Sequence, residues 1–399
     1  MSNNTPANSQ MIGNLSNLKA LADGLVSKLQ PYELYICYVI LGTMAVIPIF
    51  YGSKASVEQS KHQDAEKLSK SDAYLFPLYG SATLFSFYLL FKYFSKEYLN
   101  YLLTAYFSVI GIAALVKLAD SCISRYLPKS FFVFEHSLVL SKKGDEAPVF
   151  SLEISLPGIV YSVLSTFFTG LYIWSKHWAA NNVLGMAFSL SAISLIHLDS
   201  FITGFVLLVG LFFYDIFWVF KTEVMVTVAK SFDVPVKLLM PKALVEYHLA
   251  RPIHQALLGL GDIVIPGVFI ALCYRYDQQH NQGKARSSYF VNGLVAYVAG
   301  LVCTISVMHV FKAAQPALLY LSPACILSVL VTALLNGQLK EVFAYNADEE
   351  AARSSSAKKS SPKKRSPKSL ISESDDSSEK DEVPKVKSTP RKRRQANQI

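Results

Sequence analysis

Two aspartates lie inside long apolar stretches of this chain. Asp215 sits in LFFYDIFWVF, residues 211–220, and Asp262 sits in ALLGLGDIVIPG, residues 256–267. An acid at the centre of a bilayer costs roughly 2.5–3.5 kcal/mol on insertion scales, so such a residue usually serves a function. Two of them in consecutive apolar stretches form a much narrower pattern than one, because most other acids lie at predicted helix ends or in loops.

The residues around the second acid favour a close approach of the two carboxyl groups. Gly259, Asp262 and Pro266 are spaced by three and four positions, which predicts that they share one helix face. Gly259 and Gly261 lack side chains, and small residues let membrane helices pack closely. Pro266 and Gly267 weaken the helix after the acid, so we expect free backbone groups there that contact water or a bound peptide.

The pair Asp215 and Asp262 would have the chemistry of an aspartic protease. Two carboxyl groups at short distance cannot both ionise, so they share one proton. One acid then acts as a base toward a water molecule, while the other donates a proton to the carbonyl group of the peptide bond. This chemistry uses no metal, no cofactor and no covalent intermediate. The sequence does not assign the shared proton to either acid.

Apolar runs long enough to cross a bilayer recur along the chain. The 399 residues are 52% hydrophobic and 17% charged, whereas a soluble domain carries about 25% charged residues. With about 20 apolar residues per transmembrane helix, the predicted spans are 33–51, 73–93, 99–119, 155–175, 181–198, 201–220, 254–274, 288–310 and 314–335. Only Asp199 and Ser200 separate the fifth and sixth spans, which predicts a tight hairpin. The expected fold class is an all-α polytopic membrane protein with about nine transmembrane helices.

These spans divide the chain into four regions. Residues 1–30 form a polar segment, residues 31–200 hold helices one to five, and residues 201–345 hold helices six to nine with both acids. Residues 346–399 are poor in apolar side chains and are expected to be a disordered charged tail. The first thirty residues lack the pattern of a cleavable signal peptide, so the first helix is expected to act as an uncleaved anchor.

Lysine and arginine residues predict the orientation in the membrane. The loop 52–72, the loop after the third helix and the tail share one side and are rich in Lys and Arg, which places them in the cytosol and the N-terminus in the lumen. Asn3 and Asn14 begin glycosylation sequons on that lumenal side. The loop 221–253 disagrees, because it is lumenal in this arrangement and yet carries five basic residues.

Other features of the sequence indicate further sites or exclude them. Ser361, Ser366 and Thr389 each precede a proline in the tail and are candidates for phosphorylation. About half of the net charge of +9 belongs to the tail, and no basic stretch is interleaved with aromatic residues, so no nucleic-acid partner is expected. The five cysteines are scattered and are interpreted as small buried side chains. No HExxH motif or other metal-ligand spacing occurs, so no metal is expected.

Three motifs, taken in order, resemble those of the presenilin-type intramembrane aspartyl proteases. They are Tyr214-Asp215, Gly259-Leu260-Gly261-Asp262 and Gln315-Pro316-Ala317-Leu318. The longer stretches around both acids look like the signal peptide peptidase branch of that family, and the resemblance covers residues 30–345. It implies a presenilin-like fold, a catalytic pair formed by Asp215 and Asp262, and substrate-positioning roles for the following residues: Tyr214, Gly259, Gly261, Gln315, Pro316, Ala317 and Leu318.

The resemblance also implies an activity and its partners. It implies an intramembrane aspartic endopeptidase that cleaves signal peptides and type II-oriented transmembrane segments within the lipid bilayer of the endoplasmic reticulum. It further implies activity without partner subunits, and it leaves a homo-oligomer open. The chain ends at Gln395 to Ile399 without a dilysine retention signal, which departs from this pattern.

Two other classes of function remain open from the sequence. A secondary transporter would use Asp215 and Asp262 as proton or sodium sites near the midplane of the bilayer. A scaffold would bind membrane peptides without cutting them. Asp→Asn changes separate the classes, because a protease loses cleavage, a transporter loses ion-coupled flux and a scaffold loses neither activity nor binding.

Overall fold

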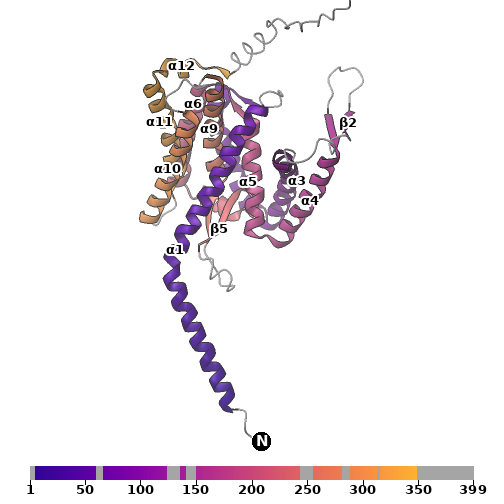
Figure 1. The fold of residues 1–399 in the computed structure, drawn as a ribbon, viewed down its shortest axis with the longest axis vertical. Coiled ribbons are helices and arrows are strands. Elements are labelled where there is room, and N and C mark those ends of the chain that lie inside the picture. The colour runs from indigo at the N-terminus through magenta and orange to yellow at the C-terminus, as the bar shows by residue number, and fades with distance from the viewer. Residues whose placement is uncertain are drawn as a thin grey trace, which may run out of the picture. The chain divides into compact units, whose positions relative to one another are not determined.

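The protein is described by a computed structural model that covers residues 5–59, 66–123, 135–140, 150–242, 255–280, 288–311 and 315–347. Nine helices of at least 18 residues succeed one another in this described part. Their bounds are α1 Thr5–Gln59, α2 Lys70–Tyr93, α3 Lys96–Ile123, α4 Leu156–Ser175, α5 Trp178–Leu195, α6 Phe201–Phe220, α9 Gly261–His280, α10 Tyr289–Phe311 and α11 Leu318–Asn336. Two short helices, α7 Val224–Ser231 and α12 Leu339–Ala344, complete the set. Figure 1 shows their arrangement.

This architecture confirms the expected all-α polytopic membrane fold. Among the described residues, seven helices are long and apolar enough to cross a membrane, namely α1, α2, α3, α4, α6, α10 and α11. The other two long helices, α5 and α9, lie where the fifth and seventh spans were predicted. The helix α1 extends well beyond the predicted span 33–51, and the candidate membrane span found within it is Tyr32–Gln59.

Two local predictions about the spans are wrong. The fifth and sixth spans do not form a hairpin pair, because α5 packs on α1, α3 and α9 while α6 packs on α2 and α11. A short strand, β4 Ile196–Leu198, separates them. The predicted span 254–274 also begins too early, since a strand, β6 Gln255–Gly259, precedes the helix that starts at Gly261. An apolar run alone cannot distinguish a buried strand from the first turn of a helix.

Three two-stranded sheets connect the helices. Strand β1 Glu66–Leu68 pairs in parallel with β4, so residues before α2 lie beside residues before α6. Strand β2 Glu135–Leu140 pairs antiparallel with β3 Phe150–Ser155 between α3 and α4. Strand β5 Lys237–Pro241 pairs antiparallel with β6, with Lys237 opposite Gly259. The third sheet leads directly into α9 and therefore into the segment with the second acid.

Helix α9 lies at the centre of the helical packing. It contacts α1, α5, α6, α10 and α11, and its residues from Val268 to Cys273 are almost completely buried. Close approach of the neighbours depends on glycine. A Cβ atom at Gly267 would lie 2.5 Å from Ile193 Cδ1 of α5, and one at Gly204 of α6 would lie 2.6 Å from Phe269 Cδ2.

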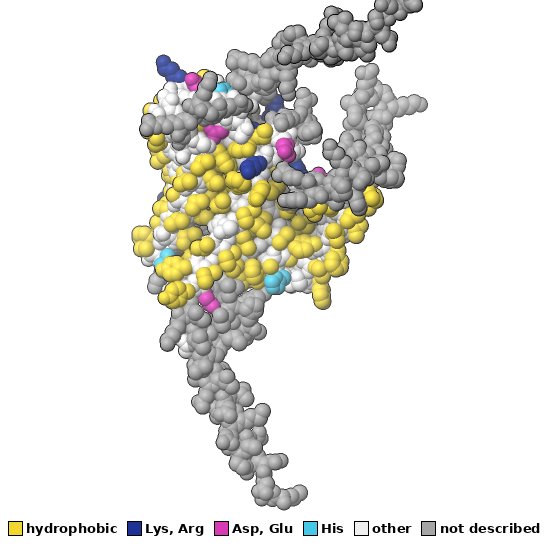
Figure 2. All heavy atoms as spheres, viewed as in Figure 1, with side chains coloured by type: hydrophobic (Ala, Val, Ile, Leu, Met, Phe, Trp, Pro, Cys, Tyr) yellow, Lys and Arg dark blue, Asp and Glu magenta, His cyan; other side chains and the backbone are white. Residues whose placement is uncertain are grey.

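The outer surface of the helices is apolar. Large hydrophobic side chains are exposed on every long helix except α5 and α9, and Figure 2 shows them covering much of one face. A soluble protein rarely exposes a contiguous apolar surface of this kind, whereas a bilayer solvates it. The structure therefore agrees with a chain that crosses the membrane several times.

Candidate active site

Helix α6 places Asp215 on its buried face. Residues Phe201, Gly204, Leu208, Leu211, Asp215 and Trp218 are buried at spacings of three and four, which is one stripe of the helix. The Asp215 side chain is only 3% exposed. The helix begins at a cap in which Ser200 Oγ accepts from the Thr203 N–H over 3.3 Å. The Trp218 ring N–H donates to Ser81 Oγ of α2 over 3.0 Å, which fixes the rotation of α6.

The third motif lies beside the first acid. Leu318 is the first residue of α11, and its backbone N–H donates a hydrogen bond to Asp215 Oδ2 over 3.2 Å. Pro316 is buried just before this helix and Ala317 is its N-terminal cap residue. The structure therefore brings Pro316, Ala317 and Leu318 to Asp215, as the resemblance implied.

Asp262 lies in the first turn of α9, directly after strand β6. Gly259 ends that strand and Gly261 begins the helix. The prediction that Gly259, Asp262 and Pro266 share one helix face is therefore wrong for Gly259. Gly259 is nevertheless adjacent to the acid, because a Cβ atom on it would lie 3.3 Å from Asp262 Oδ2. A Cβ atom on Gly261 would meet no atom within 4 Å.

Pro266 changes the backbone hydrogen bonding near Asp262. Pro266 lies inside α9 and has no N–H, so the Asp262 carbonyl lacks the donor that a regular helix would supply four residues later. The hydrogen bonds of the first turn converge on Leu260, whose carbonyl accepts from Ile263 N–H over 3.1 Å and from Val264 N–H over 2.8 Å. Free backbone groups that contact water or a bound peptide at this position stay a prediction.

The two acids approach each other across the contact between α6 and α9. These helices pack together, with Asp215 on the buried stripe of α6 and Asp262 in the first turn of α9. Asp215 is buried and Asp262 is partly exposed. Two adjacent carboxyl groups at a shielded site can share a proton and activate water between them.

Two other residues of the motifs, Tyr214 and Gln315, have contacts with residues other than the acids. The Tyr214 ring faces α2, where a Cβ atom on Gly80 would lie 3.5 Å from its Cε2 atom. Gln315 is half-buried and accepts from the Tyr320 hydroxyl over 3.5 Å. A substrate-positioning role for Tyr214 or Gln315 stays a prediction.

The candidate modification sites are not tested by the structure. Asn3, Ser361, Ser366 and Thr389 lie outside the described residues. Asn14 lies within α1, but its side chain belongs to the part that is not described.

The β5–β6 hairpin is a part of the site that the sequence did not predict. The Leu260 N–H donates to the Val236 carbonyl over 3.1 Å, and hydrogen-bonded pairs alternate along an antiparallel ladder. The backbone groups of Leu257 and Gly259 therefore point away from β5. Within the described chain no group hydrogen-bonds to them, so β6 presents an unpaired edge just before Asp262.

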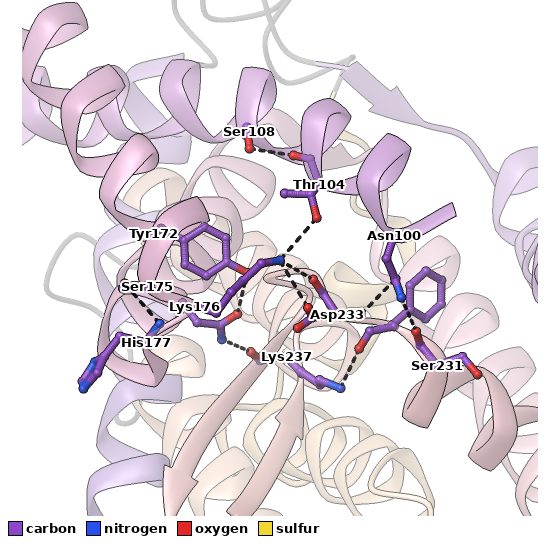
Figure 3. A network of polar contacts seen from close by, with 12 residues as sticks. Asn100, Thr104, Ser108, Tyr172, Ser175, Lys176, His177, Ser231, Asp233 and Lys237 are labelled. Atoms are coloured by element: carbon purple, nitrogen blue, oxygen red, sulfur yellow. Dashed lines mark hydrogen bonds and ion pairs between the residues drawn. The ribbon is translucent and has the colours of Figure 1, made fainter. Parts of the chain in front are cut away.

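A polar network fixes the segment that leads into β5 (Figure 3). Asn100 of α3 donates to the Ser231 carbonyl over 2.9 Å and accepts from the Asp233 N–H over 3.2 Å. Lys176, just after α4, forms an ion pair with Asp233 at 3.3 Å. Burial lowers the pKa of the Lys237 ammonium, and nearby Asp233 opposes that shift. These residues are distant in sequence, so no local motif predicted their contact.

Comparison with known proteins identifies relatives over most of the chain. Residues 60–349 match the family model described as signal peptide peptidase. The human protein named signal peptide peptidase is 43% identical over 335 residues, which cover 82% of this chain and 88% of the human one. The mouse protein of the same name has the same identity and coverage. A probable intramembrane protease of Schizosaccharomyces pombe is 37% identical over 318 residues, covering 78% of this chain and 95% of that protein.

The comparison with solved structures also found a neighbour. It is a presenilin family intramembrane aspartate protease with a TM-score of 0.39 and 17% sequence identity, and the match covers 78% of this chain and 99% of that one. The family relationship is carried by the sequence matches.

Proposed function

The chain belongs to the signal peptide peptidase family and is an intramembrane aspartic endopeptidase, and we propose that Asp215 and Asp262 are its catalytic pair. The observation that carries this proposal is the hydrogen bond from the Leu318 N–H to Asp215 Oδ2, which joins the third motif to the first acid, while α6 and α11 both pack on α9, whose first turn holds Asp262. No comparison supports the transporter or the scaffold, and both alternatives leave the match to proteases unexplained.

The two acids would cleave a peptide bond by activating water. The ionised carboxyl of the pair accepts a proton from a water molecule, whose oxygen attacks the carbonyl carbon of the substrate. The protonated carboxyl donates to the carbonyl oxygen, which gives a tetrahedral intermediate. Transfer of a proton to the amide nitrogen then breaks the C–N bond. The Leu318 N–H keeps Asp215 oriented through these steps.

The substrate would bind as an extended strand on β6. A transmembrane helix hides its peptide groups, so it must unwind before water can attack. The unpaired groups of Leu257 and Gly259 offer hydrogen bonds to the unwound segment, and strand addition to a free sheet edge is a common mode of peptide recognition. Because Gly259 directly precedes the turn with Asp262, such a strand would run past the acids.

The substrates that we propose are signal peptides and type II-oriented transmembrane segments in the endoplasmic reticulum. The names of the human and mouse relatives support signal peptides. The Lys-rich loop 52–72 and the tail support a cytosolic C-terminus and a lumenal N-terminus. The basic residues of loop 221–253 argued against this orientation. That objection is weaker in the structure, because one of them, Lys237, lies in strand β5 and donates to the Phe232 carbonyl over 3.1 Å.

Cleavage by the purified protein tests the proposal. Wild type and Asp262→Asn, each in mild detergent and in lipid, are incubated with a signal peptide whose apolar core contains helix-weakening residues. Mass spectrometry then locates the products. Cleavage inside the apolar core by wild type alone supports the catalytic pair. Equal cleavage by Asp262→Asn rejects it, and ion-coupled flux without cleavage would favour the transporter.

A further inference from the structure

Two neighbouring asparagines of α5 are buried in the protein and have no part in the chemistry above. Asn181 is 4% exposed and Asn182 is 1% exposed. Asparagine is unfavourable in the interior of a helix, and burying an amide group costs free energy unless the group is hydrogen-bonded. Both side chains lie on the face of α5 that meets β5, where Gly185 also allows close approach to Leu238.

The side-chain amide of Asn182 forms the same pair of hydrogen bonds with β5 that the backbone of a neighbouring strand would form. Its Nδ2 donates to the Leu239 carbonyl over 2.6 Å, and its Oδ1 accepts from the Leu239 N–H over 2.8 Å. The Nδ2 group also lies 3.6 Å from Met44 Sδ. Asn181 Nδ2 donates to the Lys237 carbonyl over 2.7 Å. These are the backbone groups of β5 that point away from β6.

The bonds join α5 to the strand that precedes Asp262. Leu239 lies opposite Leu257 of β6, and Lys237 lies opposite Gly259. Strand β5 therefore cannot slide along α5 without breaking both bonds of Asn182. The approach to β5 is held separately by Asn100 and Lys176, as Figure 3 shows. The hairpin is thus anchored to α3, to the end of α4 and to α5, on the side away from its free edge.

We propose that Asn182, assisted by Asn181, is a positioning residue that holds the β5–β6 hairpin in register with the aspartates and so determines which peptide bond is cut. This inference rests on the proposed function, because it requires that the substrate pairs with β6. Loss of the Asn182 bonds would let the hairpin and the bound strand move relative to Asp215, while Asp262 stays attached to β6.

An isosteric substitution tests the proposal. Asn182→Leu keeps the shape of the side chain and removes both bonds to Leu239. We expect kcat to fall by about tenfold to a hundredfold, since misplacement by 1 Å can cost that much, while KM changes little. We also expect additional cleavage sites, visible by mass spectrometry. Hydrogen exchange should be faster at the Leu239 amide than in wild type.

A second substitution on α5 controls for general loss of stability. Leu184 is 1% exposed and packs against α3, where a Cβ atom on Gly111 would lie 3.0 Å from its Cδ2 atom. Leu184→Ala opens a cavity without touching β5. At equal fraction folded it should cut at the wild-type sites. If Asn182→Leu also cuts only at those sites with the kcat of Leu184→Ala, the proposal is overturned.

The Asn182→Asp variant keeps the test decisive if Asn182→Leu does not fold. A protonated carboxyl can accept from the Leu239 N–H and donate to its carbonyl, as the amide does, whereas an ionised carboxyl can only accept. The kcat of Asn182→Asp relative to wild type should therefore rise as the pH is lowered, with cleavage returning to the wild-type sites. A ratio and a cleavage pattern that stay constant with pH contradict the proposal.

The reference reactions separate this inference from the proposed function. Wild type and Asp262→Asn are run beside the α5 variants. Cleavage by Asp262→Asn, or none by folded wild type, defeats the proposed function whatever Asn182 does. Normal behaviour of those two reactions together with unchanged sites and kcat in Asn182→Leu defeats only the positioning role.

Discussion

The backbone N–H of Leu318 donates to Asp215 Oδ2 over 3.2 Å and joins the first turn of α11 to the middle of α6. The first N–H groups of a helix have no acceptor within the helix. In a buried setting such a group must find a partner elsewhere. The carboxyl group of Asp215 therefore completes the start of α11 as well as serving the proposed chemistry.

Substitutions at Asp215 should separate these two roles. Asp215→Asn keeps an oxygen that accepts from the Leu318 N–H, and Asp215→Leu removes the acceptor while keeping the shape. We expect cleavage to fall at least about 10²-fold in both variants, since each lacks the acid. Because an unsatisfied buried donor costs about 1–3 kcal/mol, only Asp215→Leu should lose the α6–α11 contact on mild heating. Thermal melts in detergent measure this difference, and equal melting of the two variants would contradict the second role.

The two glycines of the GLGD motif should respond differently to alanine. A Cβ atom on Gly259 would lie 3.3 Å from Asp262 Oδ2, whereas one on Gly261 meets no atom within 4 Å. We expect Gly259→Ala to lower kcat/KM by about tenfold or more, because it displaces a catalytic carboxyl. Gly261→Ala should have a small effect. Cleavage assays at equal fraction folded measure both, and a larger loss in Gly261→Ala would point to a steric role against the substrate.

Gly267 should be essential for the packing of α9 on α5. A Cβ atom there would lie 2.5 Å from Ile193 Cδ1 and 3.3 Å from Ile49 Cγ1. Gly267→Ala should destabilise the protein by about 1–3 kcal/mol through overpacking. Ile193→Val removes the Cδ1 atom, so the double variant should recover part of that loss. A double-mutant cycle on unfolding free energies measures the coupling, and strict additivity would exclude the contact.

Lys176 has a backbone conformation that favours glycine. Its φ is 48°, in the left-handed region, although it is not a glycine. Lys176→Gly and Lys176→Ala both remove the ion pair with Asp233, so their difference isolates the backbone. We expect Lys176→Gly to be more stable than Lys176→Ala by about 1–2 kcal/mol. Equal unfolding free energies would show that the turn relaxes in the variants.

His197 should make the stability depend on pH. This side chain lies in β4, outside the helical spans, and burial lowers its pKa to about 3, with further lowering by the nearby charges of Arg275, Lys67 and Lys117. A depressed folded-state pKa contributes stability above the ordinary value of about 6.5, and this contribution is lost as the pH falls toward 3. The unfolding free energy should fall by up to about 1.4 kcal/mol per pH unit within that window.

A variant without a titrating group isolates this effect. His197→Gln keeps a polar side chain, so the difference in unfolding free energy between wild type and variant should shrink as the pH is lowered from neutral. A difference that is constant over the window would assign the pH dependence to other groups.

The composition of the chain predicts its spans well, because the bilayer imposes a long apolar run on each crossing. The limits of α2, α4 and α6 differ from the predicted spans 73–93, 155–175 and 201–220 by only a few residues. Asp215 and Asp262 could be singled out for the same reason, since charge inside an apolar run is rare. The proline of the third motif likewise marks the start of α11.

The parts that were missed depend on contacts between distant segments. The run AlaLeuLeuGly before Asp262 is as apolar as a helix, and only its pairing with β5 makes it a strand. Asn181 and Asn182 are the first two residues of the predicted fifth span, and their polarity is the signal that could have indicated a partner. The identity of that partner, the backbone of Lys237 and Leu239, does not follow from the sequence.

The parallel pairing of β1 with β4 has a consequence for how the chain is made. Residues 66–68 find their partner only when residues 196–198 have been synthesised. At about 5–20 residues per second, the ribosome needs on the order of ten seconds for the intervening length. During that interval α2 has already emerged and cannot yet pack on α6. The early helices must therefore wait in the membrane, held by the lipid or by the insertion machinery, until the sixth span arrives.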